Sequence, residues 1–154
     1  MRIISFSLLG LLGVASVLTP PVKSDNAGGP LLSGARIDPH VLSIIERSCR
    51  DCHSDTTYYP WYSYVAPFSW LIQNDVTGGR KHLNLSRWSD YPLVRRERSL
   101  SEIANQVRDG GMPLAQYTLI HRNARLSIAD SNAIFQWTQT ERARLIAESS
   151  GSGH

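Results

Sequence analysis

The sequence predicts an all-α protein with one domain. Apolar residues recur at helical spacing in four segments, at residues 38–50, 68–76, 100–109 and 128–147. Aspartate begins the first of these segments and serine precedes the last two, where a side-chain oxygen can cap the first helical turn. The chain has 154 residues, of which 42 % are hydrophobic and 19 % charged, so it can bury a real core and is not disordered throughout.

Residues 1–24 are typical of a secretory signal peptide or an N-terminal anchor. Arg2 supplies a positive charge, and residues 3–18 are apolar or small and uncharged. A membrane-spanning helix needs about 20 such residues, so this stretch is short. Prolines and a lysine disturb the expected cleavage pattern, which leaves both the cleaved and the anchored form open. Either form predicts export, to the periplasm in a bacterium.

The charge balance gives no case for nucleic-acid binding. The chain has 16 basic and 13 acidic residues. Two of the basic ones, Arg2 and Lys23, lie in the N-terminal segment, so the rest has 14 basic and 13 acidic residues, a net charge of +1.

The first helix is expected at residues 38–50, after a flexible linker at 25–37 that is rich in glycine and proline. Asp38 is a favourable N-cap, and Pro39 suits the first helical position because the N–H it lacks would have no helical partner there. Four apolar residues then form one helical face: Val41, Leu42, Ile44 and Ile45. This helix would deliver a cysteine motif at its C-terminal end.

The motif is Cys49-Arg50-Asp51-Cys52-His53, and it contains both cysteines of the chain. Each thiol can add across one vinyl group of a porphyrin, and the imidazole beside them can reach the iron from the same side. The spacing therefore predicts one covalently attached haem c, with His53 as the proximal iron ligand. It is the attachment signature of c-type haem.

Three other interpretations of the motif stay open at this point. A disulfide would use both cysteines but leaves His53 unexplained. A thioredoxin-like redox pair needs a βαβ context, and no strand-rich pattern surrounds the motif. A zinc site would take both cysteines and His53 from one short turn and needs a fourth ligand.

Residues 54–67 are expected to form an irregular aromatic loop with two prolines. Its rings come from Tyr58, Tyr59, Trp61, Tyr62 and Tyr64. They can wrap the edge of the haem, with Trp61 and Tyr62 as the cofactor-binding residues, or form a small aromatic core, and one residue can serve both roles.

A helix is expected from Phe68, with a break or kink at Gly78 and Gly79. Two glycines inside a helix cost about 1 kcal/mol each relative to alanine. Helical spacing resumes over residues 80–88, where Arg80, Lys81 and His82 can pair with haem propionates. Of these three, Arg80 is the predicted cofactor-binding residue.

The next helix is expected at residues 100–109, because Ser99 and Glu102 form a capping-box pattern and Gly110 and Gly111 follow. Met112 comes next, held from behind by a proline. Its thioether can be the second iron ligand, opposite His53, or it can fill a gap in the core. Three histidines compete for the second iron position: His121, His82 and His40.

The last helix is expected at residues 128–147, begun by Ser127 with Asp130 three residues on. It should cross the first helix near Trp137 and complete a domain over residues 38–148, followed by a short tail at 149–154. Tyr117 and His121, four residues apart, can share a helical face, and a structural role suits His121 better than iron ligation.

Several further segments fall in a familiar order. They are Tyr59-Pro60-Trp61-Tyr62-Ser63, Val65-Ala66-Pro67, Ser69-Trp70-Leu71, Asp75-Val76, Gly79-Arg80, Leu83-Asn84-Leu85-Ser86-x-Trp88, and Met112-Pro113 with Tyr117 and His121. Together with the cysteine motif they resemble the bacterial haem-binding domain family, over about residues 38–145. The resemblance implies a small helical, cytochrome-c-like domain around one covalent haem.

The expected function is that of a periplasmic mono-haem c-type cytochrome, an electron carrier with His53 and Met112 as iron ligands. The alternative is a peroxidase-like haem enzyme or gas sensor with an open or labile sixth position. No clear acid–base pair is present, which favours the carrier. The expected partners are redox proteins, or a larger exported oxidoreductase to which the domain docks.

Overall fold

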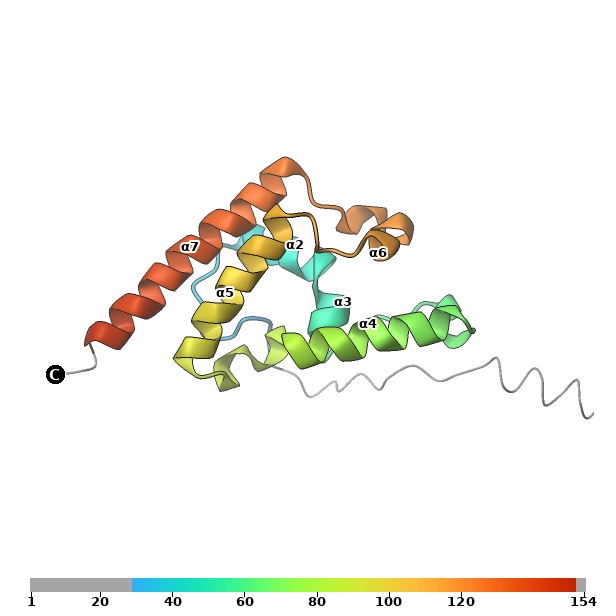
Figure 1. Cartoon of the computed structure of the whole chain (residues 1–154), viewed down its shortest axis with the longest axis horizontal. Coiled ribbons are helices and arrows are strands. Elements are labelled where there is room, and N and C mark those ends of the chain that lie inside the picture. Colours follow the sequence, from blue (N-terminus) through green and yellow to red (C-terminus); the bar gives the residue numbers. More distant parts are fainter. Residues whose placement is uncertain (1–28, 152–154) are drawn as a thin grey trace, which may run out of the picture.

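A computed structural model describes residues 29–151, and the predicted leader therefore lies outside the described residues. Within that range the chain folds into α-helices and short 3₁₀ turns without a β-sheet, so the predicted all-α class is confirmed (Figure 1). The elements are α2 (Pro39–Ser48), α3 (Arg50–His53), η1 (Trp61–Tyr64), α4 (Phe68–His82), η2 (Leu85–Asp90), α5 (Leu93–Arg108), α6 (Ala115–Ile120), η3 (Arg122–Ala124) and α7 (Ile128–Gly151). None of the described helices is long and apolar enough to cross a membrane.

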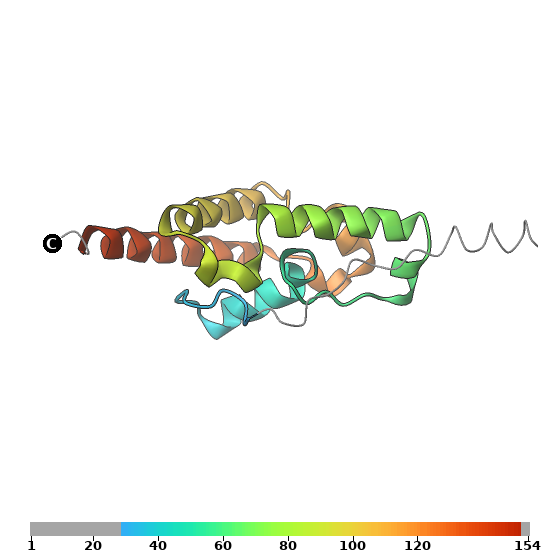
Figure 2. The same ribbon diagram turned by 90° about the horizontal axis from the view of Figure 1, so that it is seen from below.

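The core lies where α5, α7 and α2 meet. Helices α5 and α7 run side by side in both views, and α2 packs against α7 (Figures 1 and 2). Five fully buried side chains anchor the contact: Ile44, Trp88, Leu100, Ile134 and Leu145. Each large apolar side chain contributes about 1.5–3 kcal/mol when it leaves water, so this cluster holds the helices together.

The start of α2 is as predicted. The Asp38 carboxylate accepts a hydrogen bond from the backbone N–H of His40 at 2.8 Å, and Pro39 is the first helical residue. The predicted apolar face points toward the core, since Val41, Ile44 and Ile45 are buried. The helix ends at Ser48, slightly before the predicted end.

The described part of the predicted linker, residues 29–37, packs on the domain. Leu32 is only 2 % exposed, and its N–H donates to the carbonyl of Leu85 at 2.9 Å. The indole N–H of Trp137 donates to the carbonyl of Arg36 at 2.9 Å. These contacts replace the flexibility expected from composition, because the apolar pair Leu31–Leu32 finds a place in or against the core.

Three helix boundaries differ from the sequence predictions. Helix α4 continues through Gly78 and Gly79 to His82, and residues 85–90 form the 3₁₀ turn η2 instead of a second helix. Helix α5 begins at Leu93, directly after Pro92, and not at the predicted start near Ser99. Ser99 is buried inside the helix. Its end is as predicted, since Gly110 has a φ of +71°, which favours glycine.

The capping box at the start of α7 is confirmed. The Ser127 N–H donates to the Asp130 carboxylate at 2.8 Å, and the Asp130 N–H donates to Ser127 Oγ at 3.0 Å. Arg47 of α2 forms an ion pair with the same carboxylate at 2.8 Å. Helix α7 runs on to Gly151, so it includes part of the predicted tail.

Asp130→Asn should destabilise the fold at neutral pH and have little effect near pH 2. The Ser127 hydrogen bonds and Arg47 lower the pKa of Asp130 to about 2. A carboxyl with a lowered pKa stabilises the fold above its unfolded pKa, and this stabilisation is lost as the pH falls through the folded pKa. Loss of such a cap costs about 1 kcal/mol. Urea unfolding at several pH values measures the difference.

The control for this prediction is Asp109→Asn, at an exposed aspartate beyond the end of α5. It should change stability little at any pH. A deficit in Asp130→Asn that stays the same from pH 7 to pH 2 would contradict the role given to the charge.

Candidate functional site

The cysteine motif forms one short helical turn, α3, between α2 and α4. Cys49 precedes the turn, and the N–H of His53 donates to its carbonyl at 3.0 Å. This places Cys49, Cys52 and His53 on a single turn of backbone, as attachment of one planar group through all three requires. Both cysteines are free thiols, so the structure gives the disulfide interpretation no support.

Burial keeps both thiols protonated. It raises the pKa of Cys49 to about 12 and that of Cys52 to about 11. A redox-active cysteine pair needs the opposite, a lowered pKa, and zinc binds thiolates. In residues 29–151 no group of three or more His, Cys, Asp or Glu side chains is placed to hold a metal ion. The raised pKa values therefore speak against a redox-active cysteine pair, and the described side chains around the motif do not form a zinc ligand set.

His53 is oriented by the backbone that follows α4. Its Nδ1 lies 2.9 Å from the carbonyl oxygen of Leu83. A carbonyl only accepts, so Nδ1 carries the proton and Nε2 keeps its lone pair. Burial lowers the pKa of His53, with a smaller contribution from nearby His82, so the ring is neutral at pH 7. A neutral imidazole held through Nδ1 is the usual form of a metal-bound histidine.

Helix α4 lies closer to the motif than a side chain at Gly79 would permit. A Cβ built on Gly79 would lie 2.5 Å from the carbonyl oxygen of Cys52. The glycine is therefore explained by contact with the motif, and the expected break in the helix at this position was wrong.

Arg80, predicted to bind the cofactor, supports the chain that follows the motif. Its Nε donates to the carbonyl of Ser54 at 2.8 Å, and a terminal nitrogen donates to Thr57 Oγ1 at 2.9 Å. Thr57 in turn donates to the carbonyl of Asp51 at 2.6 Å. Pairing of Arg80 with a propionate stays a prediction.

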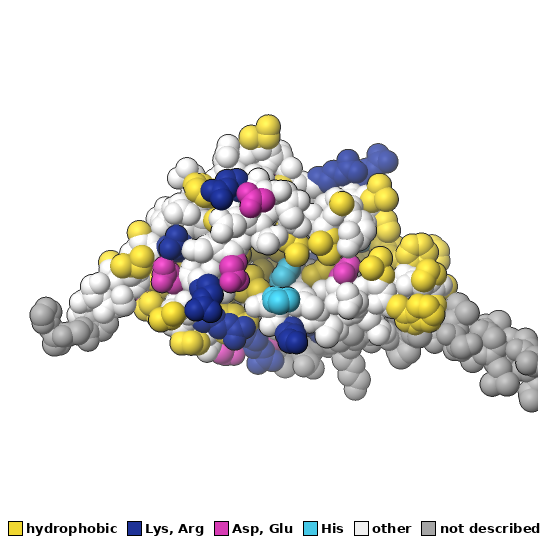
Figure 3. All heavy atoms as spheres, viewed as in Figure 1, with side chains coloured by type: hydrophobic (Ala, Val, Ile, Leu, Met, Phe, Trp, Pro, Cys, Tyr) yellow, Lys and Arg dark blue, Asp and Glu magenta, His cyan; other side chains and the backbone are white. Residues whose placement is uncertain are grey.

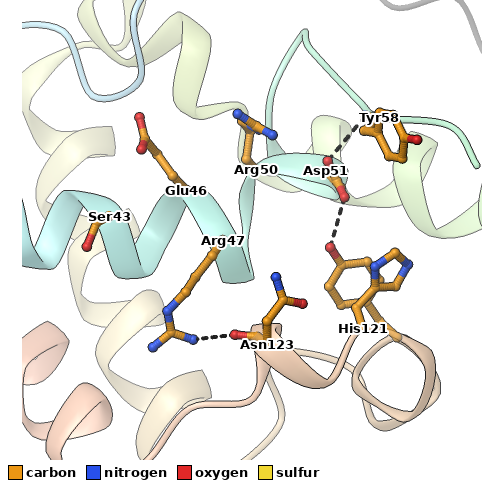
Figure 4. Close-up of a pocket in the computed structure, with 9 residues that line it drawn as sticks. Ser43, Glu46, Arg47, Arg50, Asp51, Tyr58, His121 and Asn123 are labelled. Atoms are coloured by element: carbon orange, nitrogen blue, oxygen red, sulfur yellow. Dashed lines mark hydrogen bonds between the residues drawn. The ribbon is translucent and has the colours of Figure 1, made fainter.

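Asp51, between the two cysteines, links the motif to the loop that follows it and to α6, which is distant in the sequence. Its carboxylate accepts hydrogen bonds from the Tyr117 hydroxyl at 2.8 Å and from the Tyr58 N–H at 3.2 Å (Figure 4). The Tyr117 ring stacks on His121 with centroids 4.4 Å apart, and His121 Nε2 lies 2.8 Å from the Tyr62 hydroxyl. Burial and the neighbouring Asp51 raise the pKa of Tyr117, so its hydroxyl stays a donor.

This network borders a cavity of about 400 Å³ on the side of α2 and α6. Figure 4 shows Asp51 and His121 on one side of it, with Arg47 and Glu46 of α2 on the other. The contacts of His121 favour the structural role expected for it. The role of Asp51 could not be predicted from the sequence, because its partner Tyr117 is 66 residues away.

The remaining residues predicted to bind the haem or its iron are only partly buried or exposed. Met112 is half-buried, directly after the glycine stop of α5, and its N–H donates to the carbonyl of Gln106 at 3.2 Å. Tyr62 is half-buried, whereas Trp61 is 79 % exposed. Iron ligation by Met112 and haem contact by Trp61 and Tyr62 stay predictions.

The other two histidines proposed as iron ligands, His82 and His40, lie on different helices, α4 and α2. His82, at the end of α4, lines a second cavity of about 480 Å³ with Arg95 and Arg98 of α5. His40 is exposed in the first turn of α2. Figure 3 shows histidine side chains at the centre of one face, beside a hollow with hydrophobic walls.

The chain matches a known protein family. A family model described as "Haem-binding domain" matches residues 11–140, which is more than four fifths of the chain. The matched range includes the cysteine motif, Leu83 and Met112. The searches of curated proteins and of solved structures gave no match.

Proposed function

The chain belongs to the haem-binding domain family, and from that premise we propose that it is an exported mono-haem c-type cytochrome that carries single electrons. The observation that carries the proposal is the geometry of one turn. Cys52 and His53 lie on the turn α3, Cys49 comes directly before it, and the Leu83 carbonyl accepts from Nδ1 of His53, which leaves the lone pair on Nε2.

Four residues of the chain would bind the cofactor. The two thiols would hold the haem through thioether bonds, each formed by addition of S–H across a vinyl group. His53 and Met112 would be the protein ligands of its iron. Haem, when bound, supplies an iron that alternates between the ferric and ferrous states. The protein keeps water away and sets the reduction potential, which a thioether ligand raises.

We also propose that the protein is exported and exchanges electrons with redox proteins. An exported chain meets the compartment in which c-type haem is attached, and residues 1–24 have the composition of a leader or an anchor. The partners would be redox proteins that accept or supply one electron at a time.

A denaturing gel of the exported protein, stained for haem, tests the proposal directly. Haem that stays with the denatured chain supports covalent attachment, and a chain without stain would overturn it. Carbon monoxide then separates the carrier from a gas sensor or peroxidase-like enzyme. An iron with two protein ligands binds it poorly, whereas rapid and complete binding to the ferrous protein would favour the open sixth position.

Met112→Ala should remove the sulfur–iron absorption band of the oxidised protein and lower the reduction potential by on the order of 100 mV, since a Met/His pair raises it. The ferrous variant should also bind carbon monoxide readily. The measurements are an optical spectrum and a potentiometric titration. His121→Gln is the control, because the hydrogen bond of His121 to Tyr62 occupies its Nε2. Loss of the band in His121→Gln but not in Met112→Ala would reassign the ligand.

A further inference from the structure

Exposed aromatic side chains gather at one tip of the molecule, where η1 meets the first turn of α4. We call this the aromatic tip, and its members are Trp61, Tyr64, Phe68, Trp70 and Leu71, which are between 44 % and 79 % exposed. Figure 3 shows hydrophobic side chains massed at this end of the domain, where α4 begins in Figure 1. Exposed apolar clusters of this kind mark contacts with a protein or a membrane.

The composition of the tip favours a lipid surface. Residues 56–74 include no charged side chain and no histidine. Tryptophan and tyrosine concentrate where a bilayer meets water, because each ring has an apolar body and a polar edge. A protein-binding site has in general a polar rim, often with charges that select the partner. Two of the four tryptophans, Trp61 and Trp70, are exposed at the tip, whereas Trp88 and Trp137 are buried.

The chain outside the described residues supplies a second, independent observation. Residues 3–18 are the uncharged apolar segment expected to be a leader or an anchor. The described chain begins at Gly29, where a Cβ would lie 3.8 Å from the carbonyl of Ser86. Ser86 belongs to η2, which follows the far end of α4 from the tip.

The lengths allow both contacts at once. Helix α4 has 15 residues and therefore spans about 22 Å between the tip and η2. The ten residues between 18 and 29 can extend to about 35 Å. A single bilayer can therefore hold the apolar segment and touch the aromatic tip.

We propose that the aromatic tip docks on the bilayer to which the N-terminal segment attaches the domain, with Trp61 and Trp70 at the lipid–water interface. This contact would fix the orientation of α4 relative to the plane of the membrane. It goes beyond the proposed function, and it assigns Trp61 to the bilayer in place of the haem contact predicted from the sequence.

The test uses the full chain in phosphatidylcholine vesicles that contain a photoactivatable phosphatidylcholine. Lipid adducts are mapped by mass spectrometry. We expect adducts in the N-terminal segment and in residues 56–74, unchanged at high salt because the tip has no charge. Trp61→Ser combined with Trp70→Ser should reduce the adducts at the tip by about fivefold or more, because it removes the two exposed indoles. Adducts in the N-terminal segment should not change.

The matched control changes two apolar side chains elsewhere on the surface. Leu119 and Ile128 are 70 % and 84 % exposed, and Leu119→Ser with Ile128→Ser should leave the adducts at the tip unchanged. Adducts confined to the N-terminal segment would overturn the proposal and leave the tip to a protein partner or the haem. Recovery from exporting cells of only a shortened chain, without residues 3–18, would also overturn it.

Discussion

Replacing Cys49 and Cys52 together with serine should yield a chain that keeps no haem through denaturing electrophoresis. Serine matches cysteine in shape but cannot form the thioether, so the two covalent bonds are lost while α3 is retained. Haem stain per mole of protein should fall by ~10-fold or more, to background, because the motif is the attachment signature. The thermal midpoint should also fall, since a group bound only by the native state stabilises it.

The single variants Cys49→Ser and Cys52→Ser sharpen this result. Each retains one thioether and therefore some covalent haem. The vinyl group that stays unreacted extends the conjugation of the ring, so the reduced absorption bands should move to longer wavelength. His40→Gln, at an exposed position in α2, should show none of these changes. Full haem stain in the double variant, or stoichiometric zinc in the wild-type protein, would contradict the haem interpretation.

Features that depend on residues close in sequence were predictable. The cap of α2 joins Asp38 to His40, and the cap of α7 joins Ser127 to Asp130, so each needs only a few neighbouring residues. The cysteine motif is equally local, since α3 is a single turn. Local hydrogen bonds of this kind form with little help from the rest of the fold, so the sequence pattern identifies them.

Features that depend on tertiary contact were not predictable from spacing. Leu32 looked like part of a linker, but its burial depends on Leu85, which lies more than 50 residues further on. The hydrogen bond from Tyr117 to Asp51 likewise joins segments that only the fold brings together. Ser99 matched a helix start, but packing of α5 against α7 extends the helix past it towards the N-terminus.

The glycine pair in α4 shows most clearly what helix propensity alone cannot predict. Intrinsic propensity makes Gly78 and Gly79 equally unfavourable in a helix, and on that basis the sequence predicted a break. In the folded chain they differ, because Gly79 touches the backbone of Cys52 and Gly78 has no atom within 4 Å of its Cβ position. Propensity cannot distinguish them, whereas contact with the motif does.

Alanine at these two neighbouring positions should therefore have opposite effects. Gly78→Ala should raise the free energy of unfolding by up to about 1 kcal/mol, because alanine is the better helix residue. Gly79→Ala gains the same helix propensity but places its Cβ 2.5 Å from the Cys52 carbonyl oxygen and 3.0 Å from its carbonyl carbon. Backbone atoms cannot rotate away, so α3 and α4 must separate, at a net cost of about 1–3 kcal/mol. Urea unfolding of the two variants measures both values.

The separation of α3 from α4 should also disturb the residues that bind the haem, so the effect of Gly79→Ala can be measured at the haem as well as in stability. Helix α4 leads into Leu83, whose carbonyl orients His53, and α3 carries Cys52. Gly79→Ala should therefore lower the yield of haem-loaded protein and weaken the axial ligand field seen in the optical spectrum, whereas Gly78→Ala should leave both unchanged. Equal stability of the two variants would mean that α3 and α4 are not in the close contact described. A stability loss in Gly79→Ala with a normal spectrum would place the strain away from His53.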